Sequence, residues 1–270
     1  MLTDEYVELA VVLGYSITMY AALDSRVDRI LITPLGEPLA TEDQQSLEHA
    51  GWCIHQLPSI PPPQNVTMNT VKHARFLTCF SKLHAFNMTQ YEEVVLLDAD
   101  TLVCGGIMDL FTVHARRMRE TAVHLGWVHH FMEDAGEFNF NVGVMLIRPC
   151  MKLANELHSI MLSTTLQFKF AEQGFLNDFF NVSNTNGHVE YAVLPHRFNL
   201  MASMTTLDPE LFHKIKPNAR IFHYVWLKPT AYFFLPRCHY MGTIFFCEKW
   251  TSIRRIAYDT SAKLALRADG

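Results

Sequence analysis

A short apolar run that ends in two aspartates constrains the fold of this chain more than any other feature. Val94-Val-Leu-Leu97 is followed directly by Asp98-Ala99-Asp100. The run predicts a strand, and because successive side chains of a strand point to opposite faces, we expect Asp98 and Asp100 to point the same way. Open α/β sheets bind their ligands at the carboxyl ends of their strands. The run therefore predicts an α/β fold with a functional site at residues 98–100.

Two carboxylates in this position suit a divalent cation. Carboxylate oxygens are ligands for Mn2+ and Mg2+, and such ions are often shared with the phosphates of a substrate. The bare Asp-x-Asp pattern is common, since about one is expected by chance in a chain of this length. Its position after an apolar strand makes it a candidate site for Mn2+, with Mg2+ as the alternative.

Strands and helices alternate along the chain. Leu9, Val12, Leu13 and Ile17 recur at helical spacing behind Thr3-Asp4-Glu5, which predicts a first helix. Further helices are predicted at residues 41–50, 76–83, 151–166 and 172–180, and strands at residues 27–33, 52–57, 94–97, 142–147 and 221–224. The alternation predicts a mostly parallel, doubly wound sheet with right-handed crossovers. We expect one domain over residues 1–230 and a carboxy-terminal extension over residues 231–270, whose packing the sequence does not determine.

Composition narrows the class of partner. The chain of 270 residues is 49% hydrophobic and 18% charged, which fits an enzyme-sized globular domain. A net charge of −5 gives no general attraction to nucleic acid or anionic lipid. No apolar stretch is long enough to span a bilayer, so no transmembrane segment is expected. Without a visible leader the printed sequence favours the cytoplasm, and the Golgi becomes the alternative if residues precede Met1.

The six cysteines show no C-x-x-C spacing, which indicates neither a zinc site nor a small disulfide scaffold. We expect them to be mostly buried thiols, with Cys238 and Cys247 as the only close pair in the sequence.

Three cationic or titratable residues lie near the predicted site. Lys82 falls in the helix before the Asp98 strand, where its ammonium either reaches solvent or pairs with phosphate. His223 lies in the apolar stretch 221–225, where most histidines are core residues. With Lys228 five residues on, His223 could instead complete a metal site. The residues by themselves leave both alternatives open.

Two more segments have both a structural and a functional explanation. Asn141 and Gly143 combine an amide that bonds in two directions with a glycine that permits close backbone approach, and the alternative is a tightly packed strand entry. Glu172 and Gln173 open a predicted helix, where the helix dipole alone favours a carboxylate.

Seven segments, taken in order, resemble glycosyltransferase family 8, which includes the glycogenins and the plant glycogenin-like glucuronosyltransferases. These segments are residues 2–14, 80–84, 86–89, 94–103, 140–144, 172–177 and 223–229. The resemblance covers residues 2–230, and residues 75–103 are most similar to the glucuronosyltransferase branch.

The resemblance implies a GT-A fold, a UDP-sugar donor, Mn2+ and retention of anomeric configuration. It implies that Asp98, Asp100 and His223 bind the metal and that Lys228 contacts the diphosphate. It further implies donor contacts by Leu2, Thr3, Tyr6, Arg75, Lys82, Asn141 and Gly143, and a catalytic role for Glu172 or Gln173 as weak nucleophile or cation stabiliser. Residues 198–208, where glycogenins carry a self-glucosylated tyrosine, contain no tyrosine. The implied acceptor is therefore external, a glycan, lipid or protein, and a homodimer is one open alternative for the assembly.

The chain also departs from the family pattern. Glu172 replaces an aspartate, Val142 a small residue, Trp226 a glycine and Thr230 a tryptophan, and the family's first strand would precede Thr3. These departures keep open the alternative of a catalytically impaired homologue that binds UDP and metal. A haloacid-dehalogenase-like phosphatase also has Asp-x-Asp after a strand, but it requires Gly-Thr where this chain has Thr101-Leu102.

Overall fold

The computed structural model describes residues 4–64, 66–67, 74–132, 137–164, 168, 170–185, 190–229, 238 and 242–268. The chain forms two compact units that interleave along the sequence. The first unit comprises Met1–Leu57, Asp98–Met108 and His196–Gly270, and the second comprises Pro58–Leu97 and Asp109–Pro195. The domain boundary at residue 230 stays a prediction.

The first unit contains two small sheets and their helices. Its elements are α1 (Asp4–Tyr20), β1 (Ile30–Pro34), α2 (Thr41–His49), β2 (Cys53–Leu57), β4 (Thr101–Val103), η3 (His196–Phe198), β8 (Leu200–Met201), α6 (Met204–Leu207), α7 (Pro209–Ile215), η4 (Lys216–Asn218), β9 (Ile221–His223) and α9 (Ile244–Ala268). β1 and β2 are parallel. β9 lies between β4, to which it is antiparallel, and β8, to which it is parallel.

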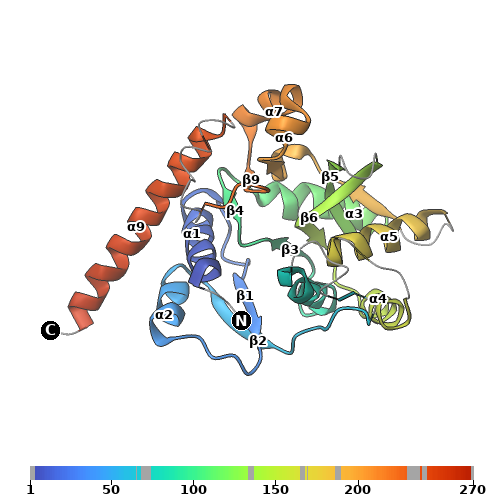
Figure 1. The fold of residues 1–270 in the computed structure, drawn as a ribbon, viewed down its shortest axis with the longest axis horizontal. Helices are drawn as coiled ribbons and strands as arrows, with labels where there is room; N and C mark the ends of the chain where they lie inside the picture. The colour runs from blue at the N-terminus through green and yellow to red at the C-terminus, as the bar shows by residue number, and fades with distance from the viewer. Residues whose placement is uncertain are drawn as a thin grey trace. The chain divides into compact units, whose positions relative to one another are not determined.

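An apolar cluster of the first unit joins α1 to β4, β9 and α9. As the helical spacing predicts, α1 buries Leu9 and Val12, which pack with Leu102 of β4 and Phe222 of β9. α9, drawn in red, runs beside α1, drawn in blue (Figure 1). It adds Trp250 to the same cluster. The carboxy-terminal extension thus contributes to this core.

The second unit holds a four-stranded sheet. Its elements are η1 (Ala74–Asn87), β3 (Val94–Leu97), η2 (Leu110–His114), α3 (Ala115–Glu120), β5 (Leu125–Met132), β6 (Glu137–Ile147), α4 (Met151–Ser163), α5 (Ala171–Thr185) and β7 (Tyr191–Val193). The strand order is β3-β6-β5-β7. The core is aromatic: the ring of Trp127 stacks on that of Phe140 at 4.5 Å and meets Phe180 edge-on at 5.3 Å.

The prediction of a mostly parallel sheet is wrong for the described strands. β3 and β5 both run antiparallel to β6, as β4 does to β9, whereas the pairs β1–β2, β5–β7 and β8–β9 are parallel. For the pair of β5 and β6, the physical reason is that the two strands follow one another closely in the chain. A short connection allows only antiparallel pairing, since a parallel pair needs a long crossover.

The expectation of six thiols is also wrong, because Cys238 and Cys247 form a disulfide with a Cα–Cα distance of 6.4 Å. Gly242, whose φ of +67° is in the left-handed region that glycine tolerates, lies between the two cysteines, where the chain turns into α9. Cys53 is a free and exposed cysteine. None of the helices in the described part of the chain is both long and apolar enough to cross a membrane.

Candidate metal and nucleotide-sugar site

Asp98 and Asp100 lie in a tight turn between β3 and β4. The amide of Thr101 donates to the carbonyl oxygen of Asp98 at 3.0 Å, and the Thr101 hydroxyl donates to the same oxygen at 2.7 Å. The sequence argument placed both carboxylates on one face of a strand. The structure also brings them together, but through a turn that begins where β3 ends at Leu97.

β9 brings His223 to this turn. His223 is paired in register with Thr101 of β4, and the amide of Tyr224 donates to the carbonyl oxygen of Asp100 at 3.0 Å. The His223 Nε2 atom lies 3.3 Å from Oδ1 of Asp100 and 4.0 Å from Oδ2 of Asp98. One ligand atom from each of the three residues lies within 4.8 Å of the others. The first unit therefore contains a compact cluster of two carboxylates and one imidazole.

Asn199, a residue that sequence reasoning missed, orients the imidazole. Its side chain is fully buried, and its Oδ1 atom lies 3.1 Å from Nδ1 of His223. A proton on Nδ1 can donate to this oxygen, which leaves the lone pair of Nε2 directed at the two carboxylates. The available sequence signal is a polar residue directly before the short apolar strand β8. This pattern is too common to single out Asn199.

Charge in the cluster keeps Asp100 ionised. Burial by itself would raise the pKa of Asp100, but His223 and Lys228 outweigh burial and hold that pKa well below its usual range. The Lys228 ammonium forms an ion pair with Oδ2 of Asp100. An ionised carboxylate is the form that binds a metal ion.

The donor set of this cluster fits a divalent cation of the Mn2+ class. Two carboxylates and one imidazole provide oxygen and nitrogen ligands, and the buried amide oxygen of Asn199 takes the place of the hydrogen-bond acceptor that usually lies behind a metal-binding histidine. Asp98 keeps 23% of its side chain exposed, so one side of the cluster is open to a ligand from solvent. The chemistry of these residues suits a metal that is also bound by a phosphate.

A second polar cluster lies within the second unit. The Lys82 ammonium of η1 pairs with the buried Glu172 carboxylate of α5 at 2.8 Å. The Oε1 atom of Gln173 accepts from Nδ2 of Asn141 at 3.2 Å. The structure thus joins these four predicted residues into two polar pairs. Asn177, which sequence reasoning did not single out, accepts from the amide of Phe140 through Oδ1 at 2.8 Å and donates to the carbonyl oxygen of Phe140 through Nδ2 at 2.9 Å.

The remaining predicted residues lie as follows. Tyr6 is half-buried in α1 against the apolar cluster of the first unit. Gly143 is buried in β6, and its amide donates to Oδ1 of Asn141 at 2.9 Å. Arg75 is in the first turn of η1. Leu2 and Thr3 lie outside the described residues.

Trp226 adopts a backbone conformation that favours glycine. Its φ is +67°, and it sits in a turn closed by the amide of Leu227, which donates to the carbonyl oxygen of Tyr224 at 3.0 Å. Tyr224 and Leu227 are fully buried, whereas 48% of Trp226 is exposed. The turn therefore keeps the left-handed conformation despite a side chain that disfavours it.

Several known proteins are similar to this chain in sequence. A family model described as "Glycosyl transferase family 8" matches residues 1–229. Rabbit glycogenin-1 is 28% identical over 230 residues, which are 85% of this chain and 63% of the relative. Inositol phosphorylceramide glucuronosyltransferase 1 of Arabidopsis thaliana is 28% identical over 177 residues, which are 66% of this chain and 28% of the relative. The chain thus spans less than two thirds of the curated relatives it matches.

A solved structure of the galactosyltransferase LgtC, in complex with donor and acceptor sugar analogues, has the same fold. Its TM-score to this chain is 0.57 at 17% sequence identity, over 93% of this chain and 92% of LgtC. The fold is therefore the GT-A fold, as the resemblance implied.

Proposed function

Because the chain belongs to glycosyl transferase family 8, we propose that it is a Mn2+-dependent, retaining glycosyltransferase that moves a hexose or glucuronic acid from a UDP-sugar to an external acceptor. The observation that carries this proposal is the Asp98–Asp100–His223 cluster with Lys228 beside it. The glucuronosyltransferase among the relatives supports glucuronic acid as one candidate sugar. The match over residues 1–229 favours this function over the phosphatase alternative.

Each residue of the cluster has a proposed role. Asp98, Asp100 and Nε2 of His223 would hold the metal, and Asn199 keeps the imidazole in the required tautomer. When bound, the metal would neutralise the charge that develops on the departing diphosphate. Lys228 adds a second positive charge beside Asp100, which suits an anionic leaving group.

Roles in the second unit follow from the resemblance. We propose that Glu172 or Gln173 stabilises the cationic anomeric carbon or acts as a weak nucleophile, and that Lys82, Asn141 and Gly143 contact the donor. The Lys82 ammonium lies 2.8 Å from the Glu172 carboxyl group and so places a positive charge beside this proposed catalytic residue. In the same way, Leu2, Thr3, Tyr6 and Arg75 remain proposed donor contacts.

Release of UDP tests the proposed function. The chain is incubated with Mn2+ and a panel of UDP-sugars that includes UDP-glucose, UDP-galactose and UDP-glucuronate, and UDP is measured with and without glycan acceptors. We expect release that requires Mn2+ and that falls at least about a hundredfold in Asp100→Ala, because a metal ligand is lost. Asp259→Ala, which removes an exposed carboxylate of α9, should leave the rate unchanged. Release that persists without Mn2+ or in Asp100→Ala would contradict the proposal.

A second candidate, a homologue that binds UDP and metal without turnover, is favoured by one observation. The exposed indole of Trp226 stands two residues before Lys228, where the family has glycine. Tight UDP binding by calorimetry, with no release from any UDP-sugar, would support this candidate instead.

A further inference from the structure

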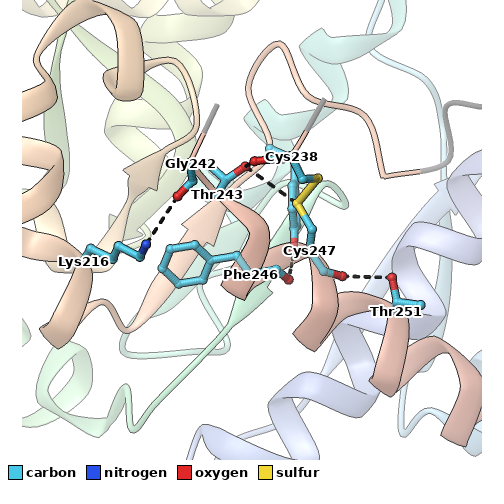
Figure 2. Close-up of a disulfide and its surroundings, with 8 residues drawn as sticks. Lys216, Cys238, Gly242, Thr243, Phe246, Cys247 and Thr251 are labelled. Carbon is cyan, nitrogen blue, oxygen red and sulfur yellow. Dashed lines mark hydrogen bonds between the residues drawn. A yellow bond between two sulfur atoms is a disulfide. The ribbon is translucent and has the colours of Figure 1, made fainter. Parts of the chain in front are cut away.

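A buried disulfide lies next to the strand that carries His223. Cys238 and Cys247 are both fully buried and are members of the apolar cluster that contains Phe222 and Tyr224. Figure 2 shows the sulfur bridge with Phe246 close to it. Phe222 and Tyr224 flank His223 in the chain, so the disulfide belongs to the same apolar cluster as the two residues adjacent to this candidate metal ligand.

Phe246, the residue before Cys247, contacts both neighbours of His223. Its ring stacks on that of Phe222, with 4.1 Å between the centroids and 8° between the planes. Its carbonyl oxygen accepts a hydrogen bond from the Tyr224 hydroxyl at 2.8 Å. A shift of Phe246 would therefore displace the backbone on both sides of His223, through Phe222 and through Tyr224.

The bridge holds Phe246 in place together with a small polar network. The amide of Thr243 donates to the carbonyl oxygen of Cys238 at 3.0 Å, and its hydroxyl lies 3.7 Å from Sγ of Cys247. Lys216 donates to the carbonyl oxygen of Gly242 at 3.3 Å, and Thr251 donates to that of Cys247 at 2.9 Å (Figure 2). The hydrogen bonds can exchange with water, whereas the sulfur bridge cannot, so the bridge limits how far the first turn of α9 can move.

We propose that the Cys238–Cys247 disulfide is a positioning element for His223, so that the affinity of the site for a divalent cation depends on the oxidised state of this pair. The inference rests on the proposed metal site. Both cysteines act through Phe246 and β9, and neither touches the site. Because cytosolic thiols are kept reduced, the form that binds metal tightly is expected in an oxidising compartment.

The affinity for Mn2+, read from the electron paramagnetic resonance signal of the free ion, tests the inference without any need for turnover. The pair is reduced with tris(carboxyethyl)phosphine under argon, and the reagent is then removed. In this step the S–S bond breaks, two thiols form, and the phosphine takes the oxygen of one water to become the phosphine oxide. We expect the dissociation constant for Mn2+ to rise about tenfold, the lower end of what the loss of a partner behind a metal ligand does.

Variants separate the bridge from other effects of the reductant. Cys238→Ser/Cys247→Ser should match the reduced chain and should not respond to the phosphine. Cys53→Ser, which removes an exposed free thiol, should behave as the unsubstituted chain does. A folded double variant, checked by circular dichroism, whose Mn2+ affinity stays within about twofold of the unsubstituted chain, below the tenfold effect expected for such a partner, would overturn the inference.

Phe246→Leu provides a second test that keeps the bridge, in case the reduced chain unfolds. It removes the stacked ring, so Mn2+ affinity should again fall, whereas Phe245→Leu, at a neighbouring residue that is 53% exposed, should not change it. Equal affinities in the two variants would contradict the inference. If the oxidised chain binds Mn2+ but releases no UDP, the proposed function fails and the inference stands. If the oxidised chain binds no Mn2+, both fail.

Discussion

The Oδ1 atom of Asn199 lies beside Nδ1 of His223 and so favours the tautomer whose unprotonated Nε2 faces the carboxylates. A histidine in a metal site must present an unprotonated nitrogen, and the buried Oδ1 of Asn199 at 3.1 Å can fix the proton on Nδ1. At the scale of single residues, we therefore expect the metal affinity of this site to depend on a side chain that would not itself touch the metal.

Asn199→Ala should therefore weaken Mn2+ binding by about 10- to 100-fold, the usual effect of removing such a partner. Titration calorimetry with MnCl2 measures it. Asn218→Ala, an exposed asparagine of η4, is the matched control and should bind Mn2+ normally. Unchanged affinity in Asn199→Ala would show that His223 keeps its tautomer without this amide.

Substitution of Trp226 measures the cost of its left-handed backbone conformation, again at the scale of a single residue. Residues other than glycine lose about 1 kcal/mol in the left-handed region, so Trp226→Gly should be more stable than Trp226→Ala by about that amount. Urea unfolding of the two variants measures the difference. Because both variants remove the indole, its contacts cancel, and an alanine variant as stable as the glycine variant would mean that the turn relaxes.

At the scale of elements, the ion pair between Lys82 and Glu172 ties η1 to α5. Glu172 keeps 6% and Lys82 19% of their side chains exposed, so the carboxylate depends on its partner. Removing one partner of such a buried pair leaves a charge without compensation, which is more costly than removing both.

Lys82→Met should lower the free energy of unfolding by about 3 kcal/mol, and Lys82→Met/Glu172→Gln by clearly less. Chemical denaturation of the single and double variants measures both values. Lys152→Met, at an exposed position of α4, controls for the loss of a positive charge. A double variant as unstable as the single one would mean that Lys82 contributes by packing rather than by charge.

The elements also show what local sequence could predict. The apolar spacing of α1 predicted that helix, and the apolar runs predicted β3, β9 and the second half of β6, because apolar residues that recur or follow one another mark segments that pack into a core. The direction of β6 was not predictable from such runs. An apolar run predicts that a strand is buried. Whether two neighbouring strands are parallel or antiparallel depends on the connection between them.

At the scale of the whole molecule, metal binding and folding are linked. Asp98 and Asp100 come from one turn of the chain and His223 from a distant strand, so the three residues meet only in the folded first unit. An ion bound by all three therefore favours the folded state over the unfolded chain.

Mn2+ at about a hundred times its dissociation constant should raise the free energy of unfolding by about 2.7 kcal/mol. Thermal unfolding with MnCl2, and again after chelation with EDTA, measures this gain and its reversal. Asp100→Asn should abolish the gain. An equal gain in that variant would place the stabilising metal elsewhere in the chain.

The sequence by itself determined the residue types and the order of the candidate site: the two aspartates after an apolar run, the histidine in a late strand and the lysine five residues beyond it. It did so because apolar patterns and ordered motifs are local properties of the chain. Only the tertiary structure decided that the aspartates converge through a turn, that Asn199 supports the imidazole and that Cys238 and Cys247 are joined. Such contacts join residues far apart in sequence or depend on how the chain turns between them, and they form only when the elements pack into one core.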